Sequence, residues 1–488
     1  VGDSSPEARA REMSVEMNVA TVDYLGDEWT FIDCPGSVEL QQDTIGAMMV
    51  ADAAIVVCEP GQERALAVTR LMKELDALGV PYLIYINKMD LPEAHVKNTL
   101  EALQGMTERP LILREVPIRE DNLVTGFIDL VSERAYQWED GAPSKLIEVP
   151  DSANGRTEEE RTQMLESLAD LNDDLLEQLL EDVIPETDEV YQNLTKDLQE
   201  SAIVPVFFGS AEHENGVVRL LKALRHETPE YTVSLDRLGV DADGEAVAQV
   251  FKTQNGAQSG KLSLARIWRG EFTDGLHVNG TRVSGIFKML GAQQNKESKA
   301  AAGQVVALGR LDGVQTSDTL SESGKLEGSE WPPFLTPVYA LAIHAGRRDD
   351  EVKMATAMTK IIEEDPSLSY GPNVDTGEHL LRGQGETHLR IVLDRLKNRN
   401  KLEVESQIPQ VAYKESIRDK VSQHARHKKQ SGGHGQFGDV HVDIKPLPRG
   451  SGFQFTDSVK GGVVPKNYIP AVEHGVKEYL ARGPLGFP

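Results

Sequence analysis

The chain has 488 residues, a formal net charge of −27, 39% hydrophobic and 26% charged residues, which at about 150 residues per domain indicates a globular protein of three or more domains. The acidic balance argues against broad, non-specific coating of nucleic acid, and we expect no DNA partner. No segment reaches the ~18 uninterrupted apolar residues of a membrane span, so we expect no membrane partner. The two cysteines, Cys34 and Cys58, exclude a disulfide scaffold and favour a reducing cytoplasm.

Three short motifs each follow an apolar segment that predicts a buried strand. Along the chain they are Asp33-Cys34-Pro35-Gly36 after Trp29–Ile32, Asn87-Lys88-Met89-Asp90 after Tyr82–Ile86, and Gly209-Ser210-Ala211 after Ile203–Phe208. Open α/β sheets bind ligands at the carboxyl ends of their strands. The order DxxG, NKxD and SA therefore predicts a guanine-nucleotide site for GTP or GDP.

The chemistry of guanine explains these residue types. The Asp90 carboxylate can accept hydrogen bonds from the ring N–H and the exocyclic amine of guanine, a pair of donors that adenine lacks. Asn87 can brace the neighbouring loop, and the aliphatic stem of Lys88 can cover a face of the base. We expect the backbone N–H groups of Ser210 and Ala211 to meet the guanine oxygen.

The phosphate end of the site needs different groups. We expect Asp33 to reach Mg²⁺ through water and the Gly36 N–H to point at the terminal phosphate. One motif alone fits an ordinary turn capped by an aspartate, but three in order make that interpretation unconvincing. The usual companion, GxxxxGK[ST], is absent, because the only Gly-Lys pairs, at 260–261 and 324–325, are each followed by Leu. We expect the native first strand and phosphate loop to precede this sequence.

Element patterns predict a multidomain α/β and α+β protein. Residues 1–232 alternate strands and helices and carry the three motifs, as in a P-loop-type GTPase domain; residues 110–200 interrupt them as an inserted subdomain. That insert opens with the strand-like Leu111–Leu113 and continues into a helical apolar period between Met164 and Val183. Short strands and turns predict a β-barrel at 233–328, a β-α-β-α pattern predicts a ferredoxin-like domain at 332–408, and a further, incomplete α+β domain occupies 409–488.

Charge is unevenly distributed along the chain. The segment from Glu158 to Glu189 is strongly acidic, whereas the segment from Lys414 to Lys429 has six basic residues against two acidic ones. A local basic patch on an acidic body suits one defined contact with RNA. Composition alone fits a solvated charged face equally well.

The whole chain resembles bacterial translation elongation factor G. Besides the DxxG and NKxD motifs, the resemblance rests on residues 363–366 (EEDP), 383–389 (GQGETHL), 411–415 (VAYKE), 430–438 (QSGGHGQFG), 446–453 and 465–472. The resemblance implies a monomeric, ribosome-bound GTPase with GTP/GDP and Mg²⁺ as cofactors. It also implies that the fourth domain contacts ribosomal RNA and tRNA at the decoding site, through Lys428, Lys429, Gly433 and His434.

This sequence departs from the family at two positions next to the nucleotide. The family's water-positioning His after DTPG is replaced by Ser37, which cannot reproduce the reach of an imidazole. Ser14 keeps a hydroxyl that could ligate Mg²⁺, but Glu12 replaces a Gly in the same segment. These changes suggest a divergent paralogue with reduced or altered GTP hydrolysis.

Three hypotheses follow. The first is a ribosomal GTPase that drives a step such as translocation. The second, favoured by Ser37, is a GTP-binding paralogue with slow or no hydrolysis that acts in ribosome recycling or regulation. The third is a non-nucleotide interaction protein on the same scaffold, and the retained Asp33, Asn87 and Asp90 argue against it.

Overall fold

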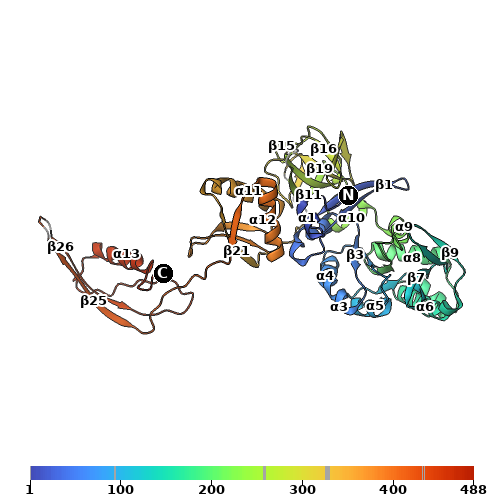
Figure 1. The fold of residues 1–488 in the computed structure, drawn as a ribbon, viewed down its shortest axis with the longest axis horizontal. Helices are drawn as coiled ribbons and strands as arrows, with labels where there is room; N and C mark the ends of the chain where they lie inside the picture. The colour runs from blue at the N-terminus through green and yellow to red at the C-terminus, as the bar shows by residue number, and fades with distance from the viewer. Residues whose placement is uncertain are drawn as a thin grey trace. The chain divides into compact units, whose positions relative to one another are not determined.

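The computed structural model describes residues 2–92, 95–256, 260–324, 330–430, 432–433 and 435–487. It divides into two compact units, Val1–Tyr370 with Leu381–Ser406, and Gly371–Leu380 with Gln407–Pro488. Figure 1 labels their helices and strands. Each unit is described by itself.

A four-stranded parallel sheet forms the centre of the first domain. Its strands, in spatial order, are β3 (Ala54–Cys58), β4 (Tyr82–Ile86), β10 (Val204–Phe208) and β5 (Leu111–Leu113). Every residue of β4, β10 and β5 is buried, as expected of parallel strands that helices cover on both faces. The helices of this domain are α1 (Pro6–Arg11), α2 (Gln42–Val50), α3 (Gln62–Ala65), α4 (Thr69–Ala77), α5 (Val96–Gln104), α9 (Val217–Glu227) and α10 (Tyr231–Leu238).

The inserted subdomain is an antiparallel meander followed by three helices. The strands are β6 (Glu115–Glu120), β7 (Leu123–Asp129), β8 (Ala135–Glu139) and β9 (Ala142–Ile147), and the helices are α6 (Asn154–Ala169), α7 (Asp173–Leu180) and α8 (Thr187–Gln199). Leu111–Leu113, which we expected to open this subdomain, pairs in parallel with β10 and so belongs to the central sheet. The predicted helical period spans two helices, because the Asn172 side chain caps α7 by accepting hydrogen bonds from two backbone N–H groups.

The strand before the first motif is not part of the central sheet. β2 (Asp27–Asp33) pairs with β1 (Asn18–Tyr24), and β1 pairs with β16 (Ile286–Leu290), so both strands extend the sheet of the barrel. The prediction of a buried strand at Trp29–Ile32 is therefore wrong: β2 is an edge strand with no buried residue. Successive side chains of a strand point to opposite faces. Trp29 and Phe31 pack against the core of the central sheet, whereas Ile32 packs against the core of the barrel.

The next two domains have the predicted architectures. The barrel strands are β11 (Val247–Gly256), β12 (Gly260–Arg269), β13 (Glu271–Thr273), β14 (His277–Val278), β15 (Thr281–Arg282), β16 (Ile286–Leu290), β17 (Gln293–Glu297), β18 (Lys299–Ala301), β19 (Val305–Gly309) and β20 (Thr319–Ser321). The third domain comprises β21 (Tyr339–Ala345), α11 (Glu351–Glu364), β22 (Ser369–Pro372), β23 (His379–Gly383), α12 (Glu386–Asn400) and β24 (Val404–Gln407). Its strand order, β22-β23-β21-β24, is that of a ferredoxin-like fold.

The described residues of the second unit after 408 form one long hairpin, a 3-10 turn at Lys466–Tyr468 and one α-helix. β25 (Val421–Lys429) and β26 (Gln436–Ile444) pair antiparallel along their whole length, and α13 spans Ile469–Leu480. All nine residues of β25 are exposed. No helix in the described ranges has both the length and the apolarity that crossing a membrane requires.

Candidate guanine-nucleotide site

Two of the motif loops meet at the carboxyl ends of neighbouring strands. β4 and β10 are adjacent, so the loops that follow them lie side by side. The Ala211 N–H donates to Asn87 Oδ1 at 2.8 Å, and the Met89 N–H donates to the Gly209 carbonyl at 3.0 Å. Asn87 thus ties the NKxD loop to the SA loop.

The Asp90 carboxylate is half-buried beside these loops. Across the part of the chain that the structure describes, it has no hydrogen-bond or ion-pair partner. Its neighbour Lys88 is held elsewhere, because Lys88 Nζ donates to Glu59 Oε1 at 2.5 Å, and this hydrogen bond lowers the pKa of Glu59. An unpaired carboxylate at this position can accept both guanine donors.

The SA loop uses its N–H groups in hydrogen bonds to neighbouring loop residues. The Ser210 N–H donates to the Asn215 carbonyl at 3.0 Å, and the Asn215 N–H returns a hydrogen bond of 2.9 Å to the Ser210 carbonyl. Both N–H groups that we expect to meet the guanine oxygen therefore already have protein acceptors, and the contact with guanine stays a prediction in which each N–H is shared.

Gly209 allows this loop to lie close to its neighbours. A Cβ at Gly209 would lie 2.1 Å from the Asn215 carbonyl oxygen and 2.2 Å from Tyr85 Oη, and Tyr85 Oη itself donates to the Asn215 carbonyl at 2.8 Å. Sequence reasoning missed Tyr85 and Asn215, although the glycine directly before Ser210 was the available signal.

Three oxygen-bearing side chains gather near the DxxG motif. Ser14 Oγ donates to Asp3 Oδ2 at 3.1 Å. Burial and, next, the negative charge of Asp3 raise the pKa of Asp33, which places Asp3 near Asp33 as well. Carboxylate and hydroxyl oxygens are the ligands that Mg²⁺ prefers, so Ser14, Asp33 and the unforeseen Asp3 fit that ion. Gly36 is exposed, and no atom lies within 4 Å of a Cβ built on it.

Ser37 has a local structural task. It is the N-cap of the short 3-10 turn Val38–Leu40, and its hydroxyl accepts the Glu39 N–H at 3.4 Å. The replacement of an imidazole at this position therefore leaves a side chain that interacts with its own turn.

Glu39, two residues after Ser37, contacts the third domain. Its Oε2 accepts the backbone N–H of His388 at 2.8 Å, in the first turn of α12. A Cβ on Gly385, the N-cap residue of α12, would lie 2.3 Å from Glu39 Cδ. Sequence reasoning missed this contact, because its partners are 349 positions apart.

Further ion pairs join the same region to α12. Glu16 accepts from Arg395 at 2.9 Å and from Arg399 at 3.3 Å, and Arg11 pairs with Asp394 at 2.6 Å. Burial by itself would raise the pKa of Glu16, but the two arginines lower it overall. The segment that carries Ser14 is therefore anchored to the third domain by charge pairs.

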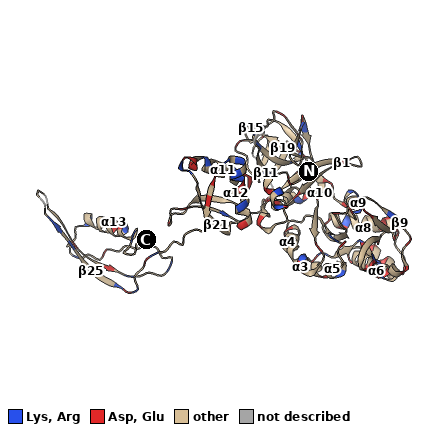
Figure 2. Cartoon of the chain, viewed as in Figure 1, with Lys and Arg blue, Asp and Glu red and all other residues tan. Residues whose placement is uncertain are grey.

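Three of the four candidate RNA-contacting residues lie in the hairpin of the second unit, whose basic residues Figure 2 marks in blue. Lys428 and Lys429 are exposed at the end of β25 and pair across the strands with Phe437 and Gln436. Gly433 has a φ of +84° with open space around its Cα. His434 lies outside the described residues.

Comparisons with known proteins cover the whole chain. Residues 1–230 match the elongation factor Tu GTP binding domain, 245–323 match elongation factor G domain 2, 334–407 match elongation factor G domain III, and 409–488 match elongation factor G domain IV. A similar protein from Synechocystis sp., described as elongation factor G-like protein, is 46% identical over all of this chain and 73% of its own length. A crystal structure of a protein from Thermus thermophilus matches with a TM-score of 0.86 and 30% identity, over all of this chain and 73% of that one.

Proposed function

The chain belongs to the elongation factor G-like family of translational GTPases, and from that premise we propose that it binds GTP and GDP with Mg²⁺ and hydrolyses GTP on the ribosome to drive a step such as translocation. The observation that carries the proposal is the unpaired Asp90 carboxylate beside the Asn87–Ala211 hydrogen bond. A half-buried carboxylate without a protein partner is available to accept hydrogen bonds from a ligand.

Each site residue has a proposed task. Asp90 accepts the two guanine donors, and Asn87 keeps the two base-contacting loops together. The Lys88 stem covers the base, and the Ala211 N–H, shared with Asn87, is directed toward the guanine oxygen. At the other end Gly36 offers its N–H to the terminal phosphate, and Ser14 and Asp33, the latter through water, hold Mg²⁺, which supplies charge neutralisation for phosphoryl transfer when bound.

The ribosome is the proposed partner, with the cytoplasm as the compartment and a monomer as the acting form. The tip of the fourth domain would contact ribosomal RNA and tRNA at the decoding site through Lys428, Lys429, Gly433 and His434. The exposed lysines and the left-handed backbone at Gly433 support this part of the proposal, because phosphate contacts need accessible cations and close backbone approach needs glycine.

One observation favours a second candidate, a slow GTPase that occupies the ribosome in recycling or regulation. The Ser37 hydroxyl accepts the Glu39 N–H, and its short side chain cannot hold an attacking water in line with the terminal phosphate. Loss of a positioning group commonly lowers the rate on the order of 10²-fold. Ribosome-stimulated turnover should therefore be low and should rise in the Ser37→His variant.

Nucleotide binding to the full-length protein tests the proposal. Fluorescent GDP should be displaced by GTP but not by ATP, and Asp90→Asn should lose guanine affinity and gain affinity for xanthine nucleotides. Glu59→Gln is the matched control, because Glu59 contacts Lys88 rather than the base. Equal displacement by GTP and ATP would contradict the guanine-selective role of Asp90. No nucleotide binding at all would favour the non-nucleotide interaction protein.

Ribosome co-sedimentation across a salt series tests the RNA contact. The double variant Lys428→Ala and Lys429→Ala should bind ribosomes more weakly and with a shallower salt slope, because each lost phosphate contact removes released counterions. An unchanged slope would leave these lysines as solvated surface.

A further inference from the structure

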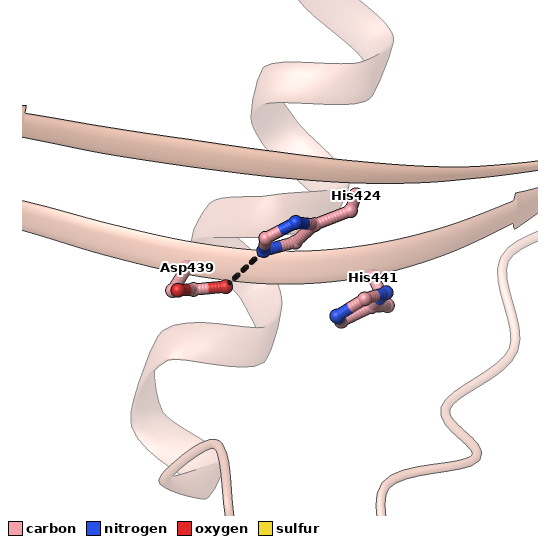
Figure 3. Close-up of side chains that lie close together, drawn as sticks. All are labelled: His424, Asp439 and His441. Carbon is pink, nitrogen blue, oxygen red and sulfur yellow. Dashed lines mark hydrogen bonds and ion pairs between the residues drawn. The ribbon is translucent and has the colours of Figure 1, made fainter.

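The hairpin of the second unit carries a cluster of two histidines and one aspartate that the proposed function does not use. His424 on β25 lies directly opposite His441 on β26, and Asp439 lies two residues before His441. Opposite residues in an antiparallel pair share a face, as do residues two apart in one strand. The three side chains therefore lie on one face of the hairpin (Figure 3).

The ligand atoms of the three side chains are close together. His424 Nε2 and Asp439 Oδ1 are 2.7 Å apart, and the two imidazole rings stack with centroids 4.2 Å apart and planes inclined by 9°. One nitrogen or oxygen from each residue lies within 4.8 Å of the other two. Of the described residues, this is the only group of three that meets that criterion.

The two oxygens of Asp439 have separate neighbours. Oδ1 faces His424, whereas Oδ2 lies 3.6 Å from Arg426 Nε. Arg426 in turn places its guanidinium over the Phe437 ring, 5.6 Å from the ring centroid. Arg426 can therefore orient the carboxylate from one side and leave the other oxygen available, which is the arrangement that outer partners of metal ligands adopt.

We propose that His424, Asp439 and His441 form a divalent metal site whose best match is Zn²⁺. Two imidazole nitrogens and a carboxylate oxygen are ligands that Zn²⁺ accepts at about 2.0–2.2 Å, and three protein ligands leave a fourth position for water or an external ligand. The two stacked rings must rotate out of their nearly parallel arrangement before both nitrogens can point at one ion, and all three side chains are accessible to solvent and so have room to rotate.

The ion would join the two strands at a defined point of the hairpin. His424 and His441 belong to different strands, and the segment between them contains Lys428, Lys429 and Gly433. A bound ion would close that segment at its base and limit the fraying of two strands whose β25 side chains are all exposed. The site does not depend on nucleotide binding.

Zinc titration of the metal-free full-length protein tests the site. Calorimetry with zinc chloride should find one equivalent that His424→Ala and His441→Ala each weaken at least about 10-fold, since loss of even an outer partner commonly costs that much. Co²⁺ in place of Zn²⁺ should give the visible absorption of a tetrahedral nitrogen–oxygen site. His427→Ala is the matched control, because His427 is on the same strand but pairs with Gly438 on the opposite face.

Two results would overturn the site. One is zinc binding by the His441→Ala variant within twofold of the parent. The other is an equal loss in His427→Ala, which would indicate unspecific binding by exposed histidines. Far-UV circular dichroism of each variant distinguishes lost ligands from a lost fold, and Asp439→Asn, which keeps the side-chain shape, gives an independent variant if an alanine variant does not fold. With either result, His424 and Asp439 form only a hydrogen-bonded pair.

Discussion

Replacing Glu39 should loosen the beginning of α12 in the third domain. The N-cap residue of that helix is Gly385, which has no side chain to accept the free N–H groups of the first turn. Glu39 accepts one of them, the His388 N–H, at 2.8 Å. Loss of an N-cap acceptor costs about 0.5–2 kcal/mol, and loss of a negative charge at a helix N-terminus costs about 0.3–1 kcal/mol.

Together these terms give about 0.8–3 kcal/mol for Glu39→Ala, which is roughly a 4- to 150-fold larger open population of the first turn. Hydrogen exchange of the backbone amides of Thr387 to Leu389 measures this directly. Glu39→Gln should show a smaller effect, because it keeps a neutral acceptor. Glu386→Ala is the control: it removes an exposed charge from the same turn that pairs with Arg390 but leaves the cap.

Unchanged exchange at His388 in Glu39→Ala would refute the reasoning. A second variant tests the geometry independently. Serine is normally a better N-cap than glycine, yet Gly385→Ser should fail to stabilise α12, because its Cβ would lie 2.3 Å from Glu39 Cδ. Combined with Glu39→Ala, the same serine should slow exchange, a non-additivity expected of residues in contact.

Three further predictions concern stability. Arg114→Ala should lower the free energy of unfolding of the first domain by about 3–5 kcal/mol, because it leaves the Glu227 side chain, which is 3% exposed, without its partner. Urea unfolding followed by tryptophan fluorescence measures this free energy. A change below about 1 kcal/mol would contradict the prediction. Burial raises the pKa of Glu115 to about 8 from 4.5, so the folded state binds more protons than the unfolded state and the free energy of unfolding should fall as pH rises from about 4.5 to 8. Glu115→Gln should flatten this dependence of the unfolding free energy on pH. An unchanged dependence would exclude Glu115 as its source. Glu12→Gly should stabilise by about 0.5–1 kcal/mol, since Glu12 has a left-handed φ of +50°, and destabilisation would show that its side chain makes a needed contact.

The sequence predicted those strands whose burial can be inferred from their own residues. Tyr82–Ile86 and Ile203–Phe208 are continuous apolar runs, and both form fully buried strands because helices cover both faces of a parallel sheet. Trp29–Ile32 looks similar in composition. Its environment differs because the pairing of β1 with β16 is set by residues about 270 positions away, at Ala20 and Leu290, and no local pattern encodes that register.

Some residues of the candidate site could likewise be identified from the sequence, and others could not. Asn87 and Asp90 were identifiable, because the motif fixes their chemistry and the strand before them fixes their place. Asp3 and Glu39 were not, since each acts through a partner that folding brings from elsewhere in the chain. Ser210 was identifiable as a site residue, but the use of its N–H depends on Asn215, which lies across a tight loop.

The most consequential of these unforeseen contacts are those of Glu16 and Glu39, each two residues after a serine that we propose to face the nucleotide. Ser14 faces Asp3, and two residues later Glu16 pairs with Arg395; Ser37 follows the DxxG motif, and two residues later Glu39 holds α12. A ligand that displaces either segment must therefore strain or release a contact with the third domain. Linkage then requires the position of α12 to alter nucleotide affinity by the same factor. For Glu39 that factor is bounded by the free energy of its contact, about 0.8–3 kcal/mol, so this route can change affinity by roughly 150-fold at most.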